Sequence, residues 1–378
     1  MKKRILIAPN SFKECADSVT LAELIKDNLV ILKNTELIIK PISDGGDGFL
    51  NVCRFYFGGE FRKYRITSAF DNSHFECSVL YCENRKEVYV ESAEVLGFKV
   101  VPLHYRNPLK LTSRGLGELL LKIESDILVG KIKAEKAYIG IGGTATIDMG
   151  MGMMAELGLK LLDSKGKNIN VIPSHFQLTK AIDYSPVKFS YKLIPVVDVN
   201  NSLLGPEGGI QVFGAQKNAN QEMISILEEN FNHPLKLFEN NNLLNPSNSL
   251  SGAGGGIPAA FQIFYKTSLL KSSDFIKVHL GLNKYVNEVE YLITGEGAYD
   301  HQSGFGKGVG VLLQLFSSNV RQIFLVSGKI SAESIPLLPK CVFPVEISKY
   351  FPSESESVIK HKEGIRKACL EIIKQLNF

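Results

Sequence analysis

The chain has 378 residues, enough for two domains or one large one, since a domain typically holds about 100–200 residues. With 44% hydrophobic and 22% charged residues, its composition is that of an ordinary soluble globular protein. Forty-three Lys and Arg against 39 Asp and Glu leave a formal charge of +4, too small an excess to predict a nucleic-acid-binding surface.

The cysteines and the N-terminus predict a cytoplasmic protein. Six cysteines lie far apart without a CxxC pair, which argues against a disulfide framework or a zinc site and favours reduced thiols. Only five apolar or near-apolar residues follow the basic start, fewer than a signal peptide needs. No apolar run approaches the roughly 20 residues that cross a bilayer, so we expect no membrane partner.

The opening 65 residues alternate between strand and helix patterns. Residues 4–8 form an apolar run that suits a strand buried on both faces, and 36–40 form a second one. Apolar residues recur at helical spacing over 19–33, with Ser18 as the expected N-cap. A further helix is expected over 49–57.

The middle of the chain has a different pattern, and the end returns to the first. Residues 75–81 and 86–91 indicate an antiparallel hairpin. The remaining predicted elements are a helix over 116–125, a strand over 137–141, a helix that ends at 157, a loop over 239–251, strands over 289–293, 322–326 and 342–347, and a helix over 356–375.

This pattern predicts two α/β domains. Residues 1–65 and 286–378 would form one doubly wound, Rossmann-like parallel sheet built from both chain ends, and 66–285 would form a second α/β domain inserted between them.

Polar, glycine-rich segments follow four of the predicted strands, at the end where open parallel sheets bind ligands. This recurrence is the strongest functional signal among the residues. The segments are Pro9-Asn10-Ser11-Phe12-Lys13, residues 41–48, residues 142–148 and residues 294–307.

The Gly142-Gly143-Thr144 segment lies between a predicted strand and a predicted helix. Free backbone N–H groups at a helix N-terminus favour a bound anion; the alternative is that the glycines only make a tight turn. A P-loop NTPase is not supported, because the chain has no GxxxxGK[ST] pattern.

Acidic and basic residues in these segments leave two interpretations open. Asp44 and Asp47 lie three residues apart in a turn, where paired carboxylates can hold Mg²⁺ or can simply be solvated turn residues. Lys13, Lys217 and Lys307 also lie in polar or turn-like segments. Each lysine can neutralise phosphate oxygens or face solvent.

Taken together, the segments resemble the bacterial type 1 glycerate kinase family. Six motifs in the right order, from about residue 5 to about residue 330, carry this resemblance. They are APNSFK (8–13), PISDGGDG (41–48), IGIGGTATIDMGMGMMAELGLKLLD (139–163), DVNNSLLGPEGGIQVFGAQK (198–217), GAGGG (252–256) and ITGEGAYDHQSGFGK (293–307).

The resemblance implies ATP-dependent phosphorylation of D-glycerate with Mg²⁺, to 2-phosphoglycerate or 3-phosphoglycerate, in a cleft between two α/β domains. On this basis we expect the catalytic residues to be Asp44, Asp148, Lys13 and Asp300. The residues expected to bind substrate or phosphate are Asn10, Ser11, Gly142, Gly143, Thr144, Lys217, Glu296, Gln302 and Lys307. The expected metal ligands are Asp44, Asp47 and Asp198.

The chain departs from the family pattern at several motif positions. The departures are Glu14, Cys15, Ile147, Met149, Ala215, Asn218 and Ala298. They leave two alternatives open: a kinase of a related small hydroxy acid, and a catalytically weakened regulator that binds a sugar acid. Each hypothesis has a small molecule as the partner.

Overall fold

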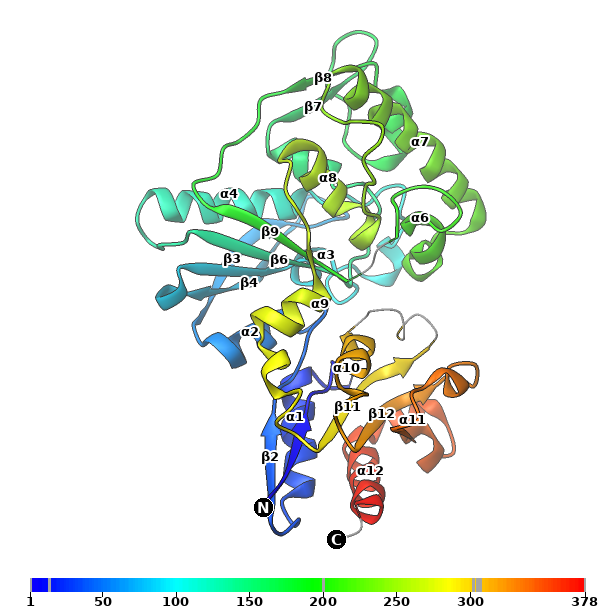
Figure 1. Cartoon of the computed structure of the whole chain (residues 1–378). Helices are drawn as coiled ribbons and strands as arrows, with labels where there is room; N and C mark the ends of the chain where they lie inside the picture. Colours follow the sequence, from blue (N-terminus) through cyan, green and yellow to red (C-terminus); the bar gives the residue numbers. More distant parts are fainter. Residues whose placement is uncertain (1, 13–14, 199–200, 301–302, 304–307, 377–378) are drawn as a thin grey trace. The chain divides into compact units, whose positions relative to one another are not determined.

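The computed structural model describes residues 2–12, 15–198, 201–300, 303 and 308–376. The chain forms two compact units, the first from 1–56 and 271–378 and the second from 57–270 (Figure 1). These bounds differ from the expected ones at 65 and 286. Residues 60–67 pair with a strand of the second unit, and Phe275 packs against Phe49 in the first.

The first unit contains a five-stranded sheet in which every described neighbouring pair runs parallel. Its order is β13 (Val342–Glu346), β12 (Gln322–Ile330), β11 (Tyr291–Tyr299), β1 (Lys3–Ile7) and β2 (Thr35–Ile39). The direction of winding reverses between β1 and β11, so their carboxyl ends flank a topological switch point, where such sheets bind ligands.

Helices cover both faces of this sheet, as expected for a doubly wound fold. α1 (Ser18–Leu29) and α12 (His361–Gln375) pack against one face, where Ile5, Ile293 and Phe324 belong to the same buried cluster. The buried residues of α10 (Gly308–Phe316) lie outside that cluster, and α10 contacts β11. α2 (Phe49–Phe57) follows β2.

Two helix predictions are corrected at the ends of the chain. Asp17, not Ser18, caps α1: its carboxylate accepts from the backbone N–H groups of Val19 and Thr20. Ser18 instead donates to the carbonyl of Ile42 at 2.7 Å. The helix expected over 356–375 is two helices, α11 (Glu354–Ile359) and α12.

The second unit contains a mixed six-stranded sheet. Its order is β10 (Leu270–Lys271), β9 (Lys192–Val197), β6 (Lys136–Ile141), β5 (Glu87–Glu91), β4 (His74–Cys82) and β3 (Glu60–Thr67). β5, β6 and β9 run parallel, whereas β3, β4 and β5 form an antiparallel meander, and its second pair, β4 with β5, is the expected hairpin.

Several helices and a small two-stranded sheet complete the second unit. The helices are α3 (Ser92–Leu96), α4 (Arg114–Leu128), α5 (Met151–Glu156), α6 (Gly209–Phe213), α7 (Gln221–Asn240) and α8 (Ile257–Phe264); the short α9 (Ser272–Asp274) belongs to the first unit. The small sheet pairs β7 (Leu159–Leu162) with β8 (Ala181–Tyr184). Residues of β5, β6, α4, α5, α7 and α8 share one buried core.

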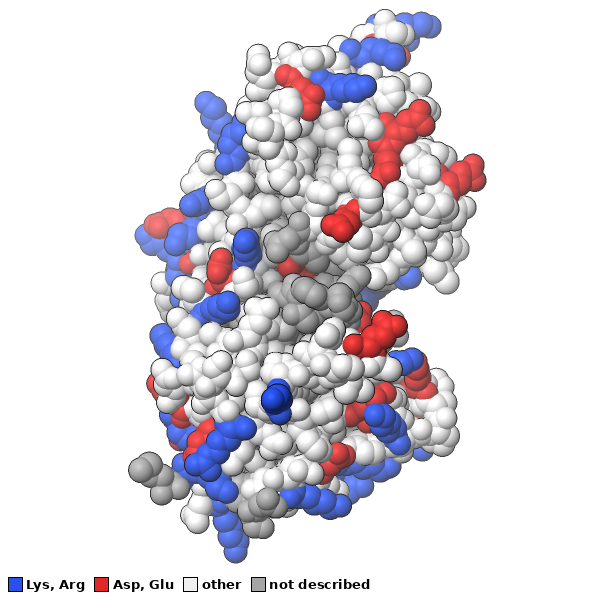
Figure 2. Space-filling view, turned by 45° about the vertical axis from the view of Figure 1, so that its right-hand side comes forward, with Lys and Arg blue, Asp and Glu red and all other residues white. Residues whose placement is uncertain are grey.

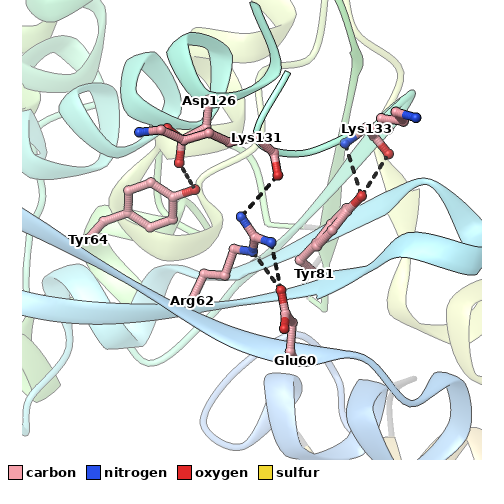
Figure 3. A network of polar contacts seen from close by, with 7 residues as sticks. All are labelled: Glu60, Arg62, Tyr64, Tyr81, Asp126, Lys131 and Lys133. Carbon is pink, nitrogen blue, oxygen red and sulfur yellow. Dashed lines mark hydrogen bonds and ion pairs between the residues drawn. The ribbon is translucent and has the colours of Figure 1, made fainter. Parts of the chain in front are cut away.

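A polar network ties β3 and β4 to the last turn of α4 and the segment after it (Figure 3). The Tyr64 hydroxyl donates to Asp126 at 2.9 Å, and Arg62 donates to the carbonyl of Lys131 at 3.3 Å. Burial and the hydrogen bond to Asp126 raise the pKa of Tyr64, so its hydroxyl stays protonated as a donor. We interpret this network as structural.

Charged side chains of both signs are spread over the face shown in Figure 2. Among the described residues, no helix is long and apolar enough to cross a membrane.

Candidate active site

In the first unit, Asn10 connects β11 with the segments that follow β1 and β2. Its backbone N–H donates to the carbonyl of Gly295 at 2.8 Å, and its side-chain Nδ2 donates to Asp44 Oδ2 at 3.1 Å. Its Oδ1 accepts from the Ser11 N–H at 2.9 Å. Asn10 is only 6% exposed, so it fixes the geometry of this edge at the switch point beside β1 and β11.

Asp44 is held in a tight turn between β2 and α2. Its Oδ1 accepts from the Gly46 N–H at 3.1 Å, while Gly45 and Gly48 have φ angles of 100° and 86° that favour glycine. Asp44 and Asp47 are both partly exposed. A carboxylate oxygen has two lone-pair positions, so Asp44 can still accept from a ligand.

The Gly-rich segment after β11 is not the loop that the sequence suggested. Residues 294–299 continue β11 and pair with β12, with Glu296 opposite Ser327. A Cβ at Gly295 would lie 1.6 Å from the carbonyl oxygen of Val326, so only glycine fits there. Glu296 is therefore carried on a rigid strand beyond the end of β1.

Asp300 follows directly on β11 and is exposed. Its Oδ1 accepts from the Ser303 N–H at 2.9 Å. Burial and the nearby charges of Glu296 and Asp300 raise the pKa of Tyr299 to about 12. Acidic groups thus gather around the end of β11.

In the second unit, Asp148 is a fully buried carboxylate with four donors. Oδ2 accepts from Ser113 N at 2.6 Å, Ser113 Oγ at 2.7 Å and Gly152 N at 3.1 Å, and Oδ1 accepts from Gly150 N at 3.1 Å. The carboxylate joins the starts of α4 and α5, where negative charge is favourable. Burial raises its pKa, and these hydrogen bonds oppose the rise.

The Gly142-Gly143-Thr144 segment does not begin a helix, contrary to expectation. α5 starts at Met151, and Thr144 instead makes a β-bridge with Gly97. Gly142 and Gly143 are partly exposed, so their backbone remains within reach of a ligand.

Lys217 is buried rather than solvated, with only 6% of its surface exposed. Its ammonium donates to Thr144 Oγ1 and to the carbonyl of Thr146, both at 2.9 Å. Burial lowers its pKa to about 7, and the charge of Asp148 partly offsets this. Lys217 therefore anchors the 142–148 loop from the protein interior and does not face solvent.

The expected site residues thus fall into a group in each unit. The first unit holds Asn10, Ser11, Asp44, Asp47, Glu296 and Asp300, and the second holds Gly142, Gly143, Thr144, Asp148, Asp198 and Lys217. Asp198 directly follows β9. Lys13, Gln302 and Lys307 lie outside the described residues.

Ser113 contacts a candidate site residue, and the sequence analysis missed it. Its hydroxyl donates to Asp148 and accepts from the Met153 N–H at 2.9 Å, so it links α4, α5 and the 142–148 loop. A Ser just before a predicted helix is a typical N-cap signal, but nothing in the sequence pairs it with Asp148.

Comparison with known proteins adds independent evidence. Residues 5–377 match the model of the Glycerate kinase family. The chain is 31% identical to a glycerate kinase of Bacillus cereus over 82% of this chain and 81% of the relative. It is 32% identical to glycerate 2-kinase of Escherichia coli over 80% and 79%. A crystal structure assigned to glycerate kinase 2 of Salmonella typhimurium LT2 matches all of both chains, with a TM-score of 0.74 and 26% identity.

Proposed function

The chain belongs to the glycerate kinase family and is a kinase, and from this premise we propose that it phosphorylates D-glycerate with ATP. The observation that carries the proposal is the match over residues 5–377, because it includes every segment that the fold places at a strand end. A small hydroxy acid is then the acceptor, and an alcohol oxygen receives the phosphoryl group.

We infer that the product is 2-phosphoglycerate and that the chain belongs to the type 1 branch of the family. Support for the first comes from the E. coli relative, which is named glycerate 2-kinase. Support for the second comes from the six motifs. The cytoplasmic location remains a prediction from sequence.

Phosphoryl transfer asks the protein mainly to position two substrates and to balance charge. Asn10 and Asp44 supply a fixed donor and acceptor at the β1 switch point. Asp44 and the exposed Asp300 are the acids we propose to orient or deprotonate the attacking hydroxyl, since each has an oxygen that a substrate can reach.

Mg²⁺ fits the acids of the first unit. Among the described residues no three His, Cys, Asp or Glu side chains gather as a metal site. Mg²⁺ does not require such a cage, because it commonly uses one or two carboxylates with substrate phosphates and water. Asp44 and Asp47 would hold it, and the ion would neutralise charge on the phosphates.

In the second unit we propose that Asp148 positions the loop rather than transferring a proton. Asp148 is 0% exposed, and its carboxylate accepts hydrogen bonds from Ser113, Gly150 and Gly152. The Gly142 N–H already donates to Ser92 Oγ at 3.2 Å, so the partly exposed Gly143 would present its backbone N–H to an anionic group of a substrate.

The test is an assay of ADP release with purified protein, ATP, Mg²⁺ and D-glycerate, with L-glycerate and glycerol as comparisons. We expect turnover with D-glycerate well above the other two, and loss of turnover with EDTA. Enolase converts only the 2-phosphate, so adding it identifies the product. Preference for another hydroxy acid would favour the alternative suggested by the motif departures, and binding of glycerate without turnover would favour a regulator.

A further inference from the structure

The GAGGG segment, residues 252–256, leads into α8 through an unusual backbone conformation. Gly254, Gly255 and Gly256 have φ angles of 55°, 74° and 88°, in the left-handed region that favours glycine. Three successive left-handed residues specify one path of the chain, because a residue with a Cβ is unfavourable at each position. Glycine is also used where two backbones approach closely, so the neighbours of the segment indicate its role.

Two glycines of the GAGGG segment lie directly against the 142–148 loop. A Cβ at Gly254 would lie 2.4 Å from Cγ2 of Ile141, the last residue of β6 before the loop. A Cβ at Gly255 would lie 2.0 Å from the carbonyl oxygen of Thr146. The segment therefore contacts the chain on both sides of the glycine pair of this loop, and a side chain would push the two apart.

Met149, which follows Asp148, is held in a strained conformation by the same segment. Its φ angle is 55° and it is fully buried. A bulky residue takes this conformation at a cost in free energy, and only where the surrounding structure fixes it. The Met149 N–H donates to the Gly255 carbonyl at 3.0 Å, and a Cβ at Gly256 would lie 2.9 Å from Met149 Cα. The GAGGG segment thus imposes on this end of the loop a backbone conformation that the methionine disfavours.

The start of the GAGGG segment is bonded to the chain that follows β9. The Gly252 N–H donates to the carbonyl of Asn201 at 2.9 Å, and a Cβ at Gly209 would lie 2.4 Å from the Gly252 carbonyl oxygen. Ser202 and Ser251 form a β-bridge beside this contact. Because β6 and β9 are parallel neighbours, one segment joins the residues that follow both strands, at the edge where parallel sheets bind ligands.

We propose that the GAGGG segment is a positioning element of the kinase. It acts through the 142–148 loop: by fixing the backbone of this loop, it sets the direction in which the Gly143 N–H meets the anionic group of a substrate. A donor that is already oriented needs no rearrangement when the substrate binds, which favours affinity and turnover. The consequence for substrates rests on the proposed function, whereas the effect on the loop can be measured without it.

Gly255→Ala tests the contact between the segment and the loop, and Gly130→Ala is its matched control. Both glycines have a φ angle of 74°, but a Cβ at Gly130 would have no described atom within 4 Å. Both variants therefore carry similar backbone strain, and only Gly255→Ala displaces the loop. Hydrogen–deuterium exchange of the full chain, read by mass spectrometry, should be about tenfold faster over 142–148 in Gly255→Ala and unchanged there in Gly130→Ala.

The same proteins are compared for the Kd of ATP with Mg²⁺ and of D-glycerate by calorimetry, and for kcat and both KM values by ADP release. We expect Gly255→Ala to weaken one of the two substrates about tenfold, the loss of one hydrogen bond to a charged group, and to leave the other within about twofold. Gly130→Ala should keep both. Gly254→Ala is a milder second variant, because its Cβ would meet the Ile141 side chain rather than backbone, and the thermal midpoint checks folding.

Wild-type exchange over 142–148 in both Gly254→Ala and Gly255→Ala would overturn the proposal. Faster exchange with unchanged Kd, KM and kcat would overturn it too, because the segment would then only support the fold. Weakening of both substrates by the same factor would indicate a general loss of structure, again contrary to the proposal. No turnover of D-glycerate by the wild type, together with faster exchange and weaker ATP binding in Gly255→Ala but not in Gly130→Ala, would support the positioning role and reject the proposed substrate.

Discussion

At the scale of single residues, Asp148 is an acid of the candidate site whose buried carboxylate we expect to stabilise the fold rather than to transfer a proton. Ionised, it can accept from all four donors that surround it. The sequence could show that an acid follows the glycines of this motif. It could not show that Ser113, 35 positions earlier in the chain, would surround that acid with donors. Such partners depend on tertiary packing.

Asp148→Asn should lower the free energy of unfolding by about 2–3 kcal/mol, because an amide nitrogen would meet a donor and leave a buried N–H unsatisfied. Chemical denaturation monitored by circular dichroism measures this. Asp183→Asn, whose exposed carboxylate pairs only with Lys160 at the surface, should cost less than about 1 kcal/mol. Equal, small losses in both variants would show that the buried donors do not depend on the charge.

Lys217 gives the protein a pH-dependent stability. Its pKa is near 7 in the folded chain against 10.5 in the unfolded one. Between these values the unfolded chain binds a proton that the folded chain lacks, so the free energy of unfolding should rise with pH, by at most about 1.4 kcal/mol per pH unit.

Lys217→Met should flatten this rise, because the buried amine is gone. Urea unfolding of both proteins at several pH values from about 7.5 to 9 measures the difference. Lys122→Met, at a partly exposed position on α4, should keep the wild-type slope. The same slope in all three proteins would mean that Lys217 does not titrate in this window.

At the scale of elements, the apolar strands and most helix cores followed from sequence periodicity, because burial imposes that pattern locally. The conformations of the Gly-rich segments did not follow from periodicity. Residues 294–299 have few strand-forming side chains, yet they remain in β11 because β12 supplies hydrogen-bonding partners. Residues 142–144 look like the entry to a helix, yet Thr144 pairs with Gly97. In both segments the conformation depends on backbone pairing with residues distant in the sequence.

Gly295→Ala should test the rigid end of β11. A Cβ there would lie 1.6 Å from Val326 O, so β11 and β12 must separate, at a cost of about 2–4 kcal/mol in the free energy of unfolding. Turnover should fall as well, because Glu296 is the next residue. Ala298→Val, at an exposed position of the same strand, should change stability by less than about 0.5 kcal/mol. Thermal melts and the ADP assay report both effects, and a stable, active Gly295→Ala would refute the close strand contact.

At the scale of the whole molecule, the insertion was visible in the sequence as a change of pattern, but its edges were not. Periodicity cannot tell which sheet an edge strand joins, and residues 60–67 join the second unit through pairing with β4 and through contacts with α4. The expected Mg²⁺ and phosphate residues are likewise distributed over both units. What the sequence predicted well is the position of the strands β1, β2 and β6, which three of these segments follow.

The second unit should fold on its own, because residues 57–270 are continuous and enclose their own core. We expect this fragment to show a single cooperative thermal transition and native-like circular dichroism. A fragment of 57–198 should not, because it lacks Phe231, Phe238 and Phe261, each 0% exposed in that core. Burying one such aromatic contributes about 1.5–3 kcal/mol, so losing three removes most of the marginal stability of a domain. Cooperative unfolding of both fragments would show that α7 and α8 are dispensable, and failure of the longer one would show that this unit needs the chain ends to fold.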